Sequence, residues 1–140
     1  MQALATWRRG HEILLEDGRA HSVVVDLPPE EGGASAGTTP LELSLLALVG
    51  SIASTFVAVA HKHHLEFSGL SIAVEGNPPS PSALSGGVHG TVRVRSKADR
   101  TEVDSTLRTA LELCPVARIF AEARVPVHLE LAVTSTSRSA

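Results

Sequence analysis

The segment from Leu41 to Ala60, LELSLLALVGSIASTFVAVA, constrains this chain more than any other. It holds a single ionisable residue, Glu42, and its 20 positions are enough for a helix to cross the hydrocarbon core of a bilayer. A helix that is apolar nearly all round is otherwise found in the core of a soluble protein. The segment therefore requires either a membrane or other elements that cover it.

The composition of this segment favours the soluble alternative. Its large apolar residues are diluted by Ala, Gly, Ser and Thr, no aromatic belt flanks it, and Lys62 stands alone where a span usually has a basic cluster. Its small residues recur every three or four positions, which places them on one stripe of a helix. They are Ser44, Ala47, Ser51, Ser54 and Ala58. Such a stripe lets another backbone approach closely, so we predict a buried soluble helix without membrane contact.

The rest of the chain supplies elements that could cover this helix. Apolar and polar residues alternate in several segments, as they do in half-buried strands. The expected elements are strands at 3–8, 12–16 and 21–26, a helix from Pro40 to about 64, strands at 70–76 and 88–96, helices at 100–113 and from Pro115, and a strand at 125–133. Strands linked by hairpins, with the helices set apart, indicate an α+β fold with antiparallel sheets.

Length and charge limit the class of protein further. The 140 residues suit one domain, residues 1–140. The net charge of −3, without a basic stripe interleaved with aromatic residues, argues against a nucleic-acid partner. A single cysteine excludes an internal disulfide and a cysteine-rich metal framework. No secretory signal is visible at the N-terminus, and we expect a cytoplasmic protein.

Two side chains are candidates for chemistry. Pro115 disfavours a helical Cys114 and starts a helix of its own, so the thiol would cap that helix, where backbone N–H groups favour a thiolate. The alternative for Cys114 is a small buried apolar residue. Ser51 lies in mid-helix, where serine usually bonds back to a carbonyl one turn earlier. It also lacks the Gly-x-Ser-x-Gly turn of a serine hydrolase, so we expect no hydrolase.

The sequence gives little sign of a metal or a cofactor. His61 and His64 are one helical turn apart, but no acidic residue follows them at a sequence spacing typical of a third metal ligand. A polar helix end explains these histidines better. The other histidines are interpreted as isolated on strand faces. The glycine-rich GGASAG at 32–37 lacks the lysine of a phosphate-binding loop. We therefore predict no cofactor.

GTTPLELSLLALVGSIAS at 37–54, followed by CPVARIF at 114–120, resembles the OsmC/Ohr family of osmotically inducible and organic hydroperoxide resistance proteins. HSVVVDLPPEEGG at 21–33 resembles the strand and loop before the family's central helix. The resemblance implies an intertwined homodimer in which antiparallel sheets wrap two long helices. It also implies that two thiols at the dimer interface reduce organic hydroperoxides, helped by a Glu and an Arg. Arg9 and Arg19 lie in the region of that arginine.

The resemblance assigns positions residue by residue. Ser51 stands where the family has its attacking cysteine, and Cys114 stands where it has the resolving cysteine. Leu41 matches the Glu that follows the proline in active members, while Glu42 matches the second acidic position. The site residues implied are thus Cys114, Ser51 and Glu42.

The serine changes the expected chemistry, because an alcohol cannot be oxidised to a sulfenic acid as a thiol can. Two-thiol turnover within one chain is excluded, and the site is expected to be degenerate as a peroxidase. Three hypotheses follow. Cys114 could act as a residual peroxidase with an external thiol. The homodimer could instead bind a small apolar ligand without catalysis, with Ser51 as a hydrogen-bonding group. A weaker third is a metal at His61 and His64.

Overall fold

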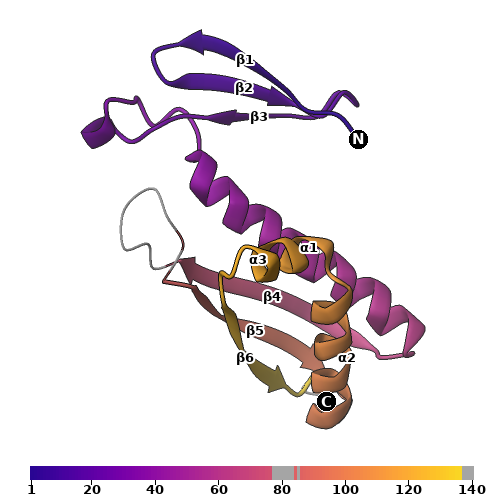
Figure 1. Ribbon diagram of the computed structural model, residues 1–140. Helices are drawn as coiled ribbons and strands as arrows, with labels where there is room; N and C mark the ends of the chain where they lie inside the picture. Colours follow the sequence, from indigo (N-terminus) through magenta and orange to yellow (C-terminus); the bar gives the residue numbers. More distant parts are fainter. Residues whose placement is uncertain (77–83, 85, 137–140) are drawn as a thin grey trace. The chain divides into compact units, whose positions relative to one another are not determined.

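The computed structural model describes residues 1–76, 84 and 86–136. The chain separates into two compact units, Met1–Ser44 and Leu45–Ala140; the single domain expected from chain length stays a prediction. Figure 1 shows the elements: β1 (Leu4–Arg9), β2 (Glu12–Glu16), β3 (Ser22–Val25), a 3-10 turn (Pro29–Glu31), α1 (Pro40–Lys62), β4 (Phe67–Gly76), β5 (Val88–Ser96), α2 (Arg100–Leu113), α3 (Pro115–Glu122) and β6 (Val127–Thr134). The α+β class and the order of elements are confirmed. The Pro- and Gly-rich sequence NPPSPSALSGG at 77–87 predicts a loop, and most of it lies outside the described residues.

The first unit is an antiparallel sheet in the order β1-β2-β3. Gly10, with φ 51°, provides the positive φ of the turn between β1 and β2. Of residues 1–44, only three are buried: Glu12, Val25 and Asp26. Trp7 is 67% exposed, and its indole N–H donates to the Gly10 carbonyl at 3.0 Å. A three-stranded sheet needs a covered apolar face to be stable, and this unit has almost no core of its own.

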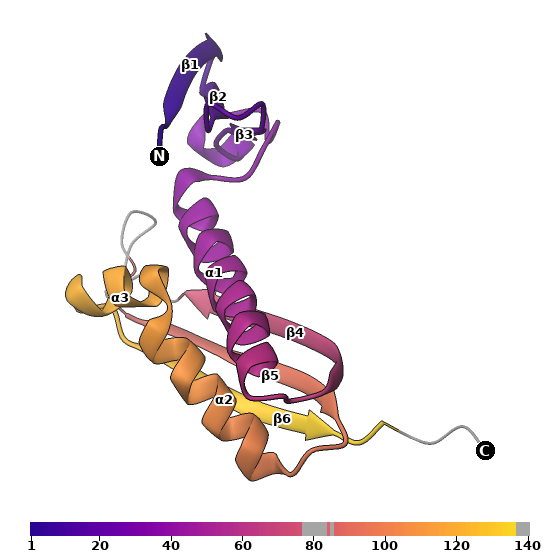
Figure 2. The same cartoon turned by 90° about the vertical axis from the view of Figure 1, so that its right-hand side faces the viewer.

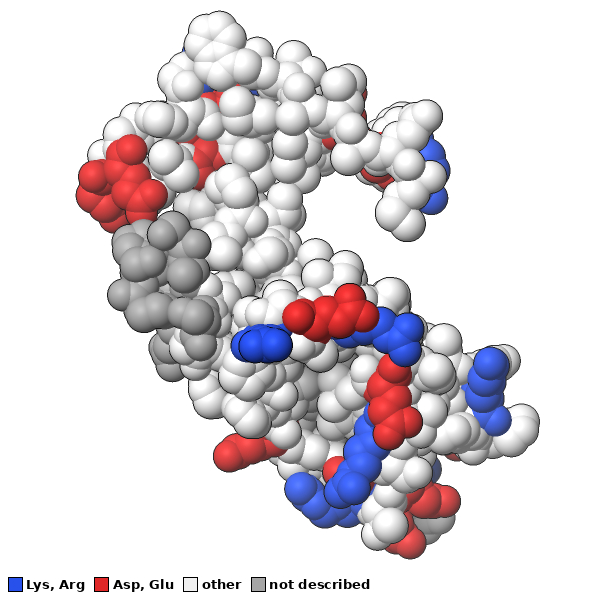
Figure 3. Space-filling model, in the orientation of Figure 1, with Lys and Arg blue, Asp and Glu red and all other residues white. Residues whose placement is uncertain are grey.

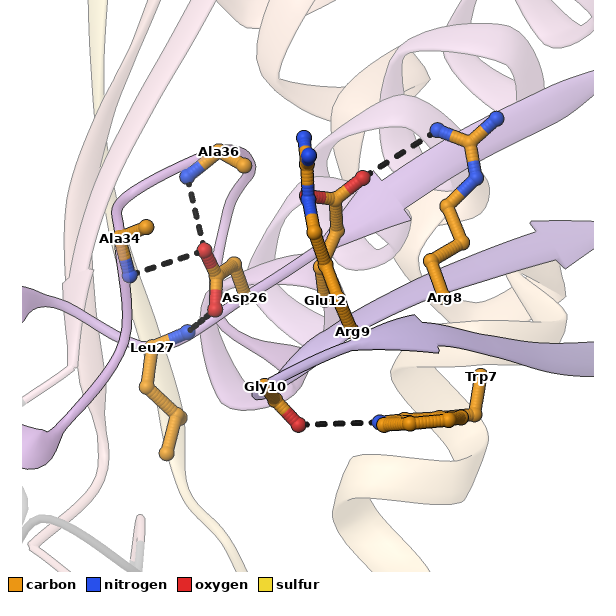
Figure 4. A network of polar contacts seen from close by, with 9 residues as sticks. All are labelled: Trp7, Arg8, Arg9, Gly10, Glu12, Asp26, Leu27, Ala34 and Ala36. Carbon is orange, nitrogen blue, oxygen red and sulfur yellow. Dashed lines mark hydrogen bonds and ion pairs between the residues drawn. The ribbon is translucent and has the colours of Figure 1, made fainter.

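Asp26 organises the loop that leads from β3 to α1. Its carboxylate accepts three backbone N–H groups, from Leu27 at 2.8 Å, Ala34 at 3.1 Å and Ala36 at 3.0 Å, as Figure 4 shows. These bonds, the one from Ala36 above all, lower the pKa of Asp26. The loop is also tightly packed, because a Cβ on Gly33 would collide with the Leu27 carbonyl oxygen. A buried carboxylate thus fixes the chain just before the helix.

The second unit contains a sheet in the order β4-β5-β6. β4 and β5 are antiparallel, but β5 and β6 are parallel, with Val92 opposite Leu131. This corrects the expectation that all the sheet pairs are antiparallel. The cause is the connection: α2 and α3 carry the chain from the end of β5 back along the sheet, and such a crossover joins parallel strands.

Figure 2 shows α1 and α2 on the same side of this sheet. One face of each element forms the core there: Leu48, Ile52, Phe56 and Val59 of α1, Val88, Val92 and Val94 of β5, and Val103, Leu107 and Ala110 of α2. The Phe56 ring meets Phe67 edge to face, with centroids 5.5 Å apart. Alternation predicts that Val88, Val92 and Val94 of β5 face inward, and all three are buried. Helical spacing predicts one inward face of α2 formed by Val103, Leu107, Ala110 and Leu111, of which the first three are buried and Leu111 is partly buried.

Several apolar and small residues of α1 are exposed among the residues that the structure describes. Leu46 is 55% exposed and Val57 is 48% exposed, and Ala47, Gly50 and Ala58 beside them are exposed as well. By length and composition alone α1 could cross a membrane, with a mean hydropathy of 2.2 over a window of which 28% is buried. Its buried stripe nevertheless packs on a sheet, as in a soluble core.

Candidate active site

The hydroxyl groups of α1 divide into two kinds. Three of them bond back to a carbonyl within the preceding turn: Ser44 to Leu41 at 2.6 Å, Ser54 to Gly50 at 2.9 Å and Thr55 to Ser51 at 2.8 Å. Such bonds satisfy a hydroxyl inside a helix and carry no further function. The half-buried Ser51 hydroxyl differs, because its Oγ accepts a hydrogen bond from the thiol of Cys114, 63 residues further along the chain.

Cys114 lies at the junction of α2 and α3 and belongs to both helices as a cap. Its backbone is extended, with φ −67° and ψ 116°, as expected for a residue before proline. The Ala117 N–H donates to its Sγ at 3.4 Å, so the thiol caps α3 as the sequence predicted. Cys114 is 0% exposed and lies in the apolar core.

The distance between Cys114 Sγ and Ser51 Oγ is 3.1 Å. Two sulfur atoms at these positions would be about 1 Å farther apart than the roughly 2.05 Å of a disulfide bond, so a side-chain rotation would have to bring them together. As it stands, the pair is a thiol and an alcohol joined by a hydrogen bond. This hydrogen bond satisfies the buried thiol and the half-buried hydroxyl group. A thiol and an alcohol cannot form a disulfide, because a disulfide needs two sulfur atoms.

Glu42, the third site residue expected, caps the start of α1. Its carboxylate accepts the Thr39 N–H at 2.8 Å and the Thr38 hydroxyl at 3.1 Å, while the Glu42 N–H donates to Thr39 Oγ1 at 3.2 Å. This is a capping box. The Thr39 backbone bond is the main cause of a lowered pKa for Glu42. A role for Glu42 at the thiol stays a prediction.

The two candidate arginines have carboxylate partners close by in sequence. Arg9 Nε donates to Glu12 Oε2 at 3.1 Å, and this bond is the main cause of a lowered pKa for Glu12. Arg19 pairs with Asp17 at 3.2 Å. Both ion pairs lie within residues 1–44, and both arginine side chains are largely exposed.

An apolar hollow of about 460 Å³ lies beside α3, lined by residues that include Ala117, Ala121 and Val127. Ala117 is also the residue whose N–H reaches Cys114. On the visible face of residues 45–136 in Figure 3, Lys and Arg side chains are interspersed with Asp and Glu side chains. Neither positive nor negative charge predominates on that face.

The histidines are arranged differently from the sequence interpretation. His61 and His64 are exposed at the end of α1, and in residues 1–76, 84 and 86–136 no three His, Cys, Asp or Glu side chains converge as metal ligands. His89 and His128, which we interpreted as isolated, lie directly opposite each other on β5 and β6, with ring centroids 5.2 Å apart. Their pairing follows from the parallel register of β5 and β6, whereas the sequence led us to expect antiparallel sheets.

The sequence profile of the family described as OsmC-like protein matches residues 32–130. No curated protein matches the chain. The matched span includes the capping box of α1, Ser51 and Cys114.

Solved structures match nearly the whole chain. An OsmC-like protein from Mycoplasma pneumoniae is 14% identical with a TM-score of 0.82, over 95% of this chain and 96% of that one. An organic hydroperoxide resistance protein OsmC from Legionella pneumophila is 18% identical with a TM-score of 0.66, over 96% and 97%. The organic hydroperoxide resistance protein OhrB of Bacillus subtilis is 21% identical with a TM-score of 0.62, over 94% and 98%. These similarities confirm the expected OsmC-like fold, which is that of a soluble protein.

Proposed function

This chain belongs to the OsmC-like protein family, and on that premise we propose that it is a cytoplasmic protein of organic hydroperoxide defence whose two-thiol site has lost its attacking sulfur. Cys114 retains the resolving position, and Ser51 holds the position of the attacking thiol as an alcohol. The observation that carries this proposal is the 3.1 Å contact between Cys114 Sγ and Ser51 Oγ. Two residues 63 positions apart in sequence are in contact where the family chemistry requires two thiols to meet.

The chemistry explains why the serine is decisive. In a two-thiol cycle, the first thiolate attacks a peroxide oxygen, the O–O bond breaks, an alcohol leaves and the sulfur becomes a sulfenic acid. The second thiol then displaces water and forms the disulfide. The Ser51 hydroxyl can act neither as the attacking thiolate nor as the second thiol that forms the disulfide. Cys114 can complete the first step alone, after which an external thiol must displace water from its sulfenic acid and a second must release the mixed disulfide.

The substitution Ser51→Cys tests the proposal. If the site is otherwise intact, the introduced thiol should form a disulfide with Cys114 when the variant is treated with an organic hydroperoxide. With a dithiol reductant the variant should consume that hydroperoxide at least about a hundredfold faster than the wild type, a change of about 2.7 kcal/mol in barrier. Free-thiol counts, mass spectrometry and reductant consumption measure the two effects.

Ser54→Cys is the matched control, because it adds a thiol to the same helix at an exposed position whose hydroxyl bonds to Gly50. It should form no intramolecular disulfide and leave the rate unchanged. Replacing Cys114 by serine in the Ser51→Cys variant should remove the disulfide. A Ser51→Cys variant that neither forms the disulfide nor speeds turnover would sink the proposal.

We also propose that the protein works as a homodimer. The uncovered face of α1, with Leu46 and Val57, and the nearly coreless N-terminal sheet both expose apolar surface of a kind that a single soluble chain rarely leaves open. A second copy of the chain supplies equivalent surfaces by symmetry. This supports the intertwined dimer that the family resemblance implies.

The burial of Cys114 supports a second candidate function. A thiol that is 0% exposed in the chain is poorly placed to meet a peroxide, whereas the apolar hollow beside Ala117 is open to a small molecule. In this alternative the dimer binds a small apolar ligand without catalysis. Saturable binding of an apolar fluorescent probe that is unchanged in Cys114→Ser, together with no hydroperoxide consumption by the wild type, would favour it.

A further inference from the structure

Three side chains of types that can bind metal ions form one row across the outer face of the β4-β5-β6 sheet. Glu75 of β4 is the partner of His89 of β5, which in turn is the partner of His128 of β6. All three residues are exposed. The neighbouring Val88 points to the core, so the row lies on the face opposite to α1, α2 and Cys114.

The spacing of the two imidazole rings suits a shared metal ion. The rings are stacked, with centroids 5.2 Å apart and planes that differ by 22°, so as they stand they do not aim a nitrogen of each ring at one point. With a metal–nitrogen bond of about 2.0 Å, an ion bound to both rings lies about 3.2 Å from each centroid, and the two centroids then subtend about 110° at the ion. That is close to the tetrahedral angle. To bind one ion, each ring must turn about its terminal torsion until a nitrogen points at the ion, and that torsion is broad in an exposed histidine.

The surroundings of the pair also suit a cation. His89 and His128 line a hollow of about 810 Å³ together with Glu75 and Glu130, whose carboxylates are favourable to positive charge. Leu111 of α2 also lines this hollow, so the hollow is not confined to the outer face of the sheet. The cation among the lining residues is Arg93, which lies four residues from His89 along β5, about 13 Å away. Thr91 lies between them on the same face. Water has room in the hollow to complete the coordination.

The geometry points to a divalent transition-metal site on this face, with His89 and His128 as its two protein ligands and Glu75 as a nearby negative charge. Imidazole suits Zn²⁺, Ni²⁺ and Cu²⁺, whereas Mg²⁺ and Ca²⁺ prefer oxygen ligands. The site is independent of the Cys114 chemistry, because it lies on the other face of the sheet. Two protein ligands make an exchangeable site rather than a permanently occupied one.

The test is a calorimetric titration of the full chain with Zn²⁺, using protein purified without a histidine tag and treated with a chelator. The wild type should bind one Zn²⁺ per chain. His89→Ala and His128→Ala should each weaken binding by at least about tenfold, as expected for the loss of one of two ligands. Because both side chains are exposed, the variants should fold, which circular dichroism can verify.

The double variant His61→Ala/His64→Ala is the matched control, since it removes the other exposed histidine pair. It should bind Zn²⁺ like the wild type, and so should Cys114→Ser, which separates this site from the proposed peroxidase site. The assignment is overturned if the wild type binds no Zn²⁺, or if binding survives in His89→Ala but disappears in either control.

Discussion

At the residue scale, the character of the site depends on one atom. Ser51 presents oxygen to the Cys114 sulfur at 3.1 Å, in the position where the family resemblance implies a second sulfur. The hydrogen bond satisfies two polar groups at a partly buried place, so the alcohol is compatible with the fold while it removes the redox chemistry. The other hydroxyls of α1 bond to carbonyl groups of their own helix.

Asp26 gives a prediction at this scale. Its carboxylate accepts three N–H groups of the loop before α1, and these bonds lower its pKa from the usual 3.8. A carboxyl with a lowered native pKa contributes stability above its unfolded-state pKa and loses it as the pH falls through the native pKa. Asp26→Asn should therefore have a lower melting temperature than the wild type at pH 7. The difference should shrink as the pH falls below about 4.

The control is Glu30→Gln, which changes an exposed acidic residue of the same loop. Its melting temperature should follow that of the wild type at every pH. If Asp26→Asn matches the wild type at pH 7, the bonds of Asp26 do not hold the loop.

At the element scale, the sequence predicted helices better than sheet pairing. Pro115 fixed the junction of the last two helices, and α2 covers the predicted range of 100–113. These signals are local, so they can be recognised in one segment at a time. The direction of β6 relative to β5 depends on how two helices pack between them. For that reason the parallel pair, and the meeting of His89 with His128, could not be taken from alternation alone.

The contact of Ser51 with Cys114 was likewise beyond periodicity. Helical spacing placed Ser51 on a small-residue stripe, and Pro115 placed Cys114 at a helix start, but neither pattern connects the two. The family resemblance supplied the pairing, and the geometry places their side chains in contact.

The start of α2 gives a prediction for a single element. Asp99 is its N-cap and forms a capping box with Glu102, whose carboxylate accepts the Asp99 N–H at 3.3 Å. Asp99→Ala should lower the free energy of unfolding by about 1 kcal/mol in urea denaturation. Ser105→Ala, an exposed change within the same helix, should leave it unchanged or slightly raised, because alanine favours helix. Equal stability of the two variants would show that the cap is not needed.

At the scale of the whole molecule, the uncovered face of α1 predicts how the chain assembles. The wild type should sediment at twice the 14.6 kDa of the chain. Val57→Glu places a charge on that face, and burying it without a partner in the dimer is costly, so the dimer dissociation constant should rise at least about a hundredfold.

Arg95→Glu is the matched control, because it alters charge on the exposed outer face of β5. It should leave the dimer intact. Analytical ultracentrifugation across a range of concentrations measures both variants. A wild type that sediments as a monomer at all concentrations would rule out the dimer. It would also rule out a second copy of the chain as the partner that covers the N-terminal sheet.

The exposed indole of Trp7 has one more consequence. It is the single tryptophan of the chain and lies on a sheet with almost no core. Its emission spectrum therefore reports on the N-terminal strands alone. If a second copy covers them, the emission maximum should shift to the red on dilution as water reaches the ring, so assembly can be followed by intrinsic fluorescence without a label.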